Sequence, residues 1–83
     1  MNQIDTTYLN KCNLALERAY SRLDNYQTSD IEYEIYRSVI IKEFEIINST
    51  AHDYGEFLAN ETLVLMKQFI VDSRRLIEVI DAH

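Results

Sequence analysis

The side chains best suited to chemistry gather in one stretch, INSTAHDYGEF, which runs from Ile47 to Phe57. It contains the only glycine of the chain and one of its two histidines, His52. An imidazole titrates near neutral pH and can act as a general acid or base. On a helix, His52 would share a face with Glu56, which permits a weak ion pair. His52 is therefore the first candidate for a catalytic residue.

The composition of this stretch limits what His52 could do. No Lys or Arg lies between Lys42 and Lys67, although cleavage of a phosphodiester needs a cation for the developing negative charge. One histidine with one carboxylate is also too few ligands for zinc, so we expect no metal site and no cofactor. The alternative is structural: His52 and Tyr54 would fill a helix turn or a dimer seam.

Three segments surround or contain this stretch, and apolar residues recur in each at spacings of three and four. Such stripes are typical of one face of an amphipathic helix. The first segment (6–27) has the stripe Leu9, Cys12, Leu16, Ala19, Leu23 and Tyr26. The second begins at Ser29 and has Tyr33, Tyr36, Ile40, Phe44 and Ile47, widened by Val39 and Ile46. The third (59–83) has Leu63, Met66, Phe69, Ile70, Ser73, Leu76, Ile77 and Ile80.

Local signals predict where these helices begin and end. Asp5, Thr6 or Thr7 can cap the first, and the polar segment 25–29 should form the turn that follows it. Ser29 begins a capping box with Glu32. Asn60 or Glu61 suits the start of the third helix. Within the second, we predict a break or kink between residues 48 and 55, although the periodicity also permits one unbroken helix from 29 to 58.

The composition fits a single all-α domain that spans residues 1–83. The chain has 83 residues, no proline and one glycine, and 47% of its residues are hydrophobic. We expect three long amphipathic helices in an antiparallel bundle. Their apolar faces are wider than three helices readily cover, so we expect a homodimer to complete the packing. The alternative is a compact three-helix monomer.

The net charge of −6 argues against nucleic-acid binding by the chain alone, because phosphate contacts need clustered Lys and Arg. An acidic chain is better suited to a basic protein surface, although the charge can also serve solubility alone. Cys12 is the only cysteine, so no internal disulfide forms. No apolar run reaches membrane-spanning length and the first residues lack a signal-peptide core, so we expect no membrane contact and a cytoplasmic location.

One part of the chain resembles a known family. The segment STAHDYGEFLANETLVLMKQFIVDSRRLI is similar to the C-terminal part of HEPN-type nucleotidyltransferase substrate-binding proteins. That family has the motif Arg-Asn-x-x-x-His-x-Tyr, which would place Asn48, His52 and Tyr54 at the motif positions. The segment YEIYRSVIIKEFEI, residues 33–46, also resembles the family's second helix. Together with the first helix, the similarity covers most of the chain.

The resemblance implies a set of functions. Such proteins form a complex with a minimal nucleotidyltransferase encoded beside them. Some are metal-independent ribonuclease toxins that use the motif Arg and His at a dimer interface, with Asn48 and His52 here as the matching catalytic candidates. The partner can silence them by adenylylating the motif tyrosine, which matches Tyr54. The chain departs from the pattern in two ways: Ile47 stands where the motif has arginine, and the chain is shorter than the family norm.

Three hypotheses follow. The first is a non-catalytic helical partner subunit of a nucleotidyltransferase system. The second is a ribonuclease toxin, and RNA binding is expected only in this case. It requires a cation other than the motif arginine. Arg37 could supply it only from a partner chain, because it lies nearly three helical turns before Ile47. The third is a structural or adaptor bundle in which the interrupting stretch is only a turn. Because fold does not fix function, the choice depends on where the candidate side chains lie.

Overall fold

The computed structural model describes residues 4–24 and 29–82. Three α-helices account for almost all of them: α1 (Thr6–Asp24), α2 (Asp30–Tyr54) and α3 (Asn60–Asp81). A short 3₁₀ turn, η1 (Gly55–Phe57), connects α2 to α3, and the described residues contain no strand. The predicted all-α fold with three long helices is confirmed.

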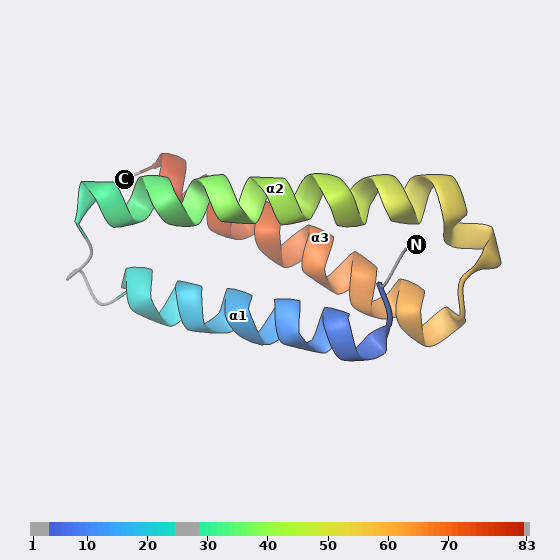
Figure 1. The fold of residues 1–83 in the computed structure, drawn as a ribbon. Coiled ribbons are helices and arrows are strands. Elements are labelled where there is room, and N and C mark those ends of the chain that lie inside the picture. The colour runs from blue at the N-terminus through green and yellow to red at the C-terminus, as the bar shows by residue number, and fades with distance from the viewer. Residues whose placement is uncertain (1–3, 25–28, 83) are drawn as a thin grey trace.

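The three helices form an antiparallel bundle in which α3 is the central element. Helices α1 and α3 run in the same direction and α2 runs in the opposite one, while α3 passes behind α2 at a slant (Figure 1). Helix α3 packs closely along both α1 and α2, whereas α1 and α2 have far less contact with each other. The bundle is elongated, with extents of 41 × 21 × 18 Å. One side of the α1–α2 pair is therefore covered by α3 and the other is not.

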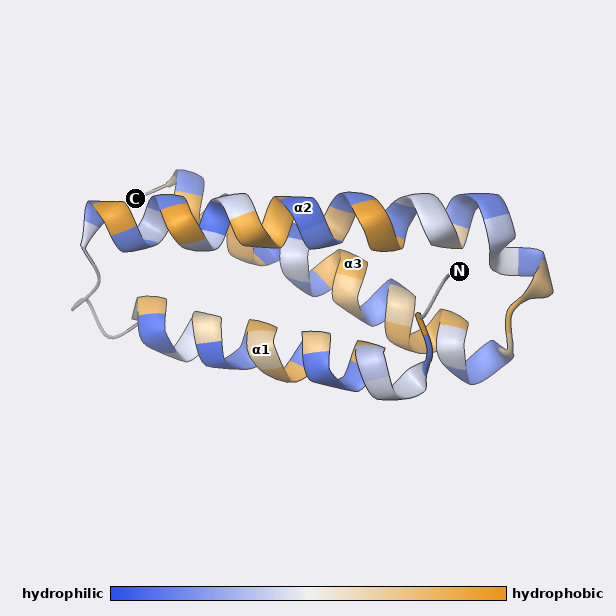
Figure 2. Ribbon diagram, viewed as in Figure 1, coloured by the Kyte–Doolittle hydropathy of each residue, from blue (hydrophilic) through white to orange (hydrophobic). Residues whose placement is uncertain are grey.

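The core is built from the three apolar stripes that the spacing predicts. Apolar residues recur along every helix (Figure 2), and those that face inward form one buried cluster. Its members are Leu9, Leu16, Ala19, Leu23, Tyr33, Ile40, Ile47, Met66, Phe69, Leu76 and Ile80. The main stripes are buried or partly buried as predicted, and Tyr26 lies outside the described residues. The prediction that Val39 and Ile46 widen the stripe of the second helix is wrong for the single chain, because both residues are exposed.

Side-chain caps form as predicted at two helix starts, but only the Ser29 half of the predicted capping box is present among the described residues. The Asp5 carboxylate accepts a hydrogen bond from the backbone N–H of Tyr8 at 2.9 Å, and Ser29 Oγ accepts one from the N–H of Glu32 at 3.3 Å. The Glu32 carboxylate pairs with Arg22 of α1 at 3.2 Å, which ties the two helices together. The residue before α3 is Ala59, which has no side-chain cap. The predicted turn lies outside the described residues, apart from Ser29 at its end.

Helix α2 continues through most of the stretch where we predicted a break or kink. It ends at Tyr54, the last position before Gly55, so the unbroken helix to residue 58 is not formed. The polar residues 48–50 stay helical because Ile47 and Thr50 are buried on the inner face. The Thr50 hydroxyl is satisfied within the helix, since Oγ1 donates to the carbonyl of Ile46 at 2.8 Å. Gly55 has right-handed backbone angles, so the helix does not end because of glycine's conformational freedom.

Candidate functional site

Asn48 and His52 lie one turn apart on the outer face of α2, and both side chains are exposed. The His52 side chain is 87% exposed, and its Nδ1 lies 3.0 Å from Oδ1 of Asp53. This contact joins neighbouring residues, and no other hydrogen bond or ion pair of His52 occurs within the described residues. The structure thus brings the two candidate catalytic residues together, but on open surface rather than in a pocket.

Tyr54 is not part of this pair. It is the last residue of α2. It lies two residues after His52, and a rotation of about 200° around the helix axis separates the two side chains. Its ring is exposed, so its phenol is accessible to a modifying enzyme. Within one chain, the His52 and Tyr54 side chains therefore lie on opposite sides of the end of α2.

Ile47 occupies the position of the family's arginine, and its side chain is 0% exposed. It belongs to the buried cluster together with Ile40 of the same helix and Met66 of α3. A phosphate-binding cation at this position would face the core of the bundle, whereas His52 faces solvent. The candidate catalytic pair therefore has no cation from the motif position.

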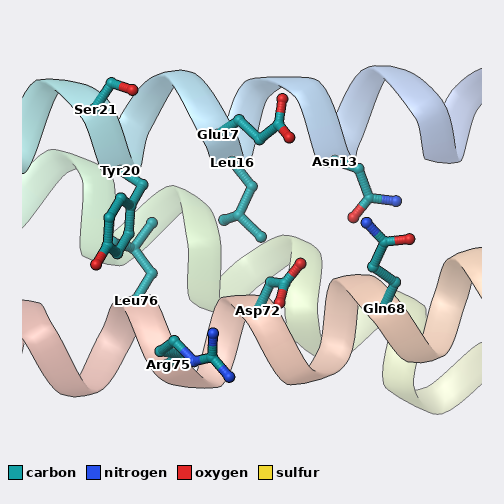
Figure 3. A pocket seen from close by; sticks show the side chains of 9 residues that line it. All are labelled: Asn13, Leu16, Glu17, Tyr20, Ser21, Gln68, Asp72, Arg75 and Leu76. Carbon is teal, nitrogen blue, oxygen red and sulfur yellow. The ribbon is translucent and has the colours of Figure 1, made fainter.

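A polar cleft of about 550 Å³ lies between α1 and α3, remote in sequence from the stretch that contains His52. Figure 3 shows its lining: Asn13, Leu16, Glu17, Tyr20 and Ser21 from α1, with Gln68, Asp72, Arg75 and Leu76 from α3. Asn13 Nδ2 donates to the Leu65 carbonyl at 3.4 Å, while its buried Oδ1 has no partner among the described residues. Asn13, Glu17 and Tyr20 follow one side of α1 beside its apolar stripe, but the cleft forms only where α3 faces them.

An apolar groove of about 390 Å³ separates α1 from α2 on the side away from α3. Phe69 of α3 forms its floor, and its lining is Tyr8, Lys11, Cys12, Ala15, Leu16, Ala19, Tyr36, Val39, Ile40 and Glu43. Burial raises the pKa of the Cys12 thiol. At one end of the groove the Tyr8 hydroxyl donates to Oε2 of Glu43 at 2.5 Å. Sequence periodicity did not identify this groove, because it depends on the separation of α1 from α2.

The Tyr8–Glu43 bond predicts a pH dependence of stability. The hydrogen bond to the Glu43 carboxylate, assisted by burial, raises the pKa of the Tyr8 phenol well above its usual value near 10. The stabilising contribution of Tyr8 is thus complete below about pH 10 and is lost as the pH rises through the higher folded-state pKa. We expect Tyr8→Phe to lower the free energy of unfolding by about 1–2 kcal/mol at pH 7. The difference in the free energy of unfolding between wild type and Tyr8→Phe, measured by urea unfolding, should become smaller above about pH 10.

The matched control is Tyr20→Phe, because Tyr20 also lies on α1 and makes no hydrogen bond within the described residues. It should leave both the stability at pH 7 and its loss at alkaline pH unchanged. Equal pH profiles for wild type and Tyr8→Phe would contradict the assigned role of the Tyr8–Glu43 bond.

Within residues 4–24 and 29–82, no three His, Cys, Asp or Glu side chains gather where they could hold one metal ion. None of the described helices combines the length and the hydropathy that a membrane crossing requires.

Comparison of the chain with known proteins finds no matching family model, no matching curated protein and no matching solved structure. The function must therefore be inferred from the geometry of the chain and from the motif residues Asn48, His52 and Tyr54.

Proposed function

We propose that the protein is a non-catalytic helical partner subunit that binds a nucleotidyltransferase-type protein and forms a homodimer. The observation that carries the non-catalytic part is the complete burial of Ile47 at the position of the motif's arginine. Without an electrostatic group of that kind, a catalysed reaction typically loses two to three orders of magnitude in rate. The exposed imidazole of His52 alone is a poor ribonuclease site.

The surface of the chain supports the partner-binding part of the proposal. Asn48, His52 and Tyr54 are all exposed near the end of α2, where a second protein can reach them. Asp53 and Glu56 lie in the same region, and the whole chain has a net charge of −6. An acidic surface of this kind suits a partner with a basic face. The Tyr54 hydroxyl would be the acceptor if the partner transfers a nucleotide.

A second candidate function is an adaptor bundle that binds another helical protein without any nucleotidyltransferase. The apolar groove between α1 and α2 favours it, because concave apolar surfaces are common sites for amphipathic helices. In this case Asn48, His52 and Tyr54 would have no role in binding.

The proposal predicts that a nucleotidyltransferase is encoded beside this gene, and co-expression of the two proteins tests it. We expect the two proteins to co-purify, and intact-mass analysis after incubation with ATP to show one added AMP on wild type and on Tyr20→Phe, but not on Tyr54→Phe. Tyr20 is the matched control because it is another exposed tyrosine. Failure of the two proteins to associate would contradict the proposal. RNA cleavage that wild type shows and His52→Ala lacks would instead establish the ribonuclease alternative.

A further inference from the structure

Helix α2 carries a second apolar stripe that the single chain leaves in water. Its members are Ile31, Ile35, Val39 and Ile46, all exposed, at spacings of four and seven residues. These spacings place the four side chains along one side of the helix, over about 23 Å. Contiguous apolar patches on soluble proteins mark interaction sites, because burying them is favourable by about 25 cal/mol per Å². We call this set the α2 ridge.

The α2 ridge borders the apolar groove, since Val39 belongs to both. The opposite wall of the groove is formed by small side chains of α1: Cys12, Ala15 and Ala19. Small residues let another helix approach closely, and a ridge on one helix packs into a groove on its neighbour. The same face of the molecule therefore carries the α2 ridge and, beside it, an apolar groove into which the ridge of another molecule could pack.

We propose that this face binds a second copy of the chain, with α2 of each protomer lying antiparallel in the groove of the other. A two-fold interface uses the same patch on both subunits, so each patch must contain both complementary features. The ridge and the small-residue wall meet this requirement. The α2 helix of the partner would then take the place of a fourth helix beside α1 and α2.

The charges on α2 favour one register for this pairing. An antiparallel contact centred between Lys42 and Glu43 sets Val39 opposite the partner's Ile46. It also sets Lys42 opposite the partner's Glu43, and the two-fold symmetry repeats this contact between the partner's Lys42 and Glu43 of the first chain. Lys42 has no ion-pair partner within the described part of its own chain. A second copy supplies that partner, whereas an unrelated helix would supply it only if it carried an acid at this position.

Standard interfaces bury about 800 Å² on each partner. The molecule is 41 Å long and 21 Å wide, so the contact must cover both the α2 ridge and the groove beside it. His52 lies about 140° around α2 from Val39, so the contact leaves the surface around His52 open. The inference rests on the homodimer of the proposed function, and its test does not require the nucleotidyltransferase.

Sedimentation measurements on the full chain over a range of micromolar concentrations test the inference. We expect wild type to dimerise and Val39→Glu to raise the dissociation constant at least about tenfold, because a carboxylate would be buried in an apolar groove. The control is Val71→Glu on α3, because Val71 is exposed to a similar extent, 54% against 57% for Val39. This control substitution should leave dimerisation unchanged. Lys42→Glu should also weaken the dimer, because it sets like charges opposite each other.

The single thiol gives a readout that needs no variant. Cys12 lies in the groove, so its rate of reaction with a maleimide should fall as the wild-type concentration rises and the dimer forms. A monomer at all concentrations overturns the homodimer itself. Three outcomes would overturn the assignment of the groove but not the proposal of a nucleotidyltransferase partner. The dimer could survive Val39→Glu, Val71→Glu could weaken it as much as Val39→Glu does, or Cys12 could react at the same rate in dimer and monomer. A monomer whose groove captures an added amphipathic helix would identify a different occupant.

Discussion

Replacing Ile47 with arginine should unfold most of the protein rather than restore a phosphate-binding cation. Ile47 is 0% exposed and packs in the cluster that joins α2 to α3. A charge buried without a partner costs several kcal/mol. A chain of 83 residues has a total stability of about 4–12 kcal/mol, at 0.05–0.15 kcal/mol per residue. Far-UV circular dichroism with urea unfolding should show a large loss of helix or a midpoint near zero urea.

Asn48→Arg is the matched control for this substitution. It adds the same side chain one position along the same helix, where the residue is exposed, and should change the free energy of unfolding by at most about 0.5 kcal/mol. Equal stability of Ile47→Arg and Asn48→Arg would mean that position 47 is not part of the core. The structural reason for regarding the protein as non-catalytic would then be lost.

The fold was predictable because the apolar residues of this chain recur with helical periodicity over three long segments. Residues such as Leu16, Ile40 and Met66 were expected in the core from spacing alone, and they are buried. With no proline and one glycine, little in the sequence competes with three helices. The caps at Asp5 and Ser29 followed from side-chain chemistry that acts over three residues.

The end of α2 was less predictable, because it depends on packing between helices. Propensity placed the break or kink somewhere between residues 48 and 55, since Asn, Ser and Thr compete for backbone hydrogen bonds. The structure keeps residues 48–54 helical, with Ile47 and Thr50 buried against the rest of the bundle. Tertiary contacts of this kind outweigh local preferences of a few tenths of a kcal/mol per residue.

The candidate site was predictable only in part. The spacing of Asn48 and His52 fixes their common face, but not whether that face is covered, and the structure leaves it exposed. The separation of α1 from α2, and hence the apolar groove, depends on α3 packing between them. Neither the groove nor the polar cleft around Asn13 can be read from a single helix, because each is formed by side chains from at least two helices.

The central position of α3 predicts the second large effect, a loss of stability in Met66→Ala. Met66 is 0% exposed on the helix that packs against both α1 and α2. Truncating a buried methionine typically costs about 2–5 kcal/mol, because it removes apolar contacts and leaves a cavity that the surroundings fill only partly. Urea unfolding at a fixed protein concentration should show a lower midpoint with an unchanged slope, since the folded structure and the surface exposed on unfolding stay the same.

Val64→Ala provides the comparison on the same helix. Val64 is 55% exposed on the outer side of α3, and alanine has the higher helix propensity, so its substitution should change stability by at most about 0.5 kcal/mol. If Met66→Ala and Val64→Ala had equal effects, α3 would not be the helix around which the bundle packs. The groove between α1 and α2 would then lose its floor, because Phe69 lies less than one turn from Met66 on α3.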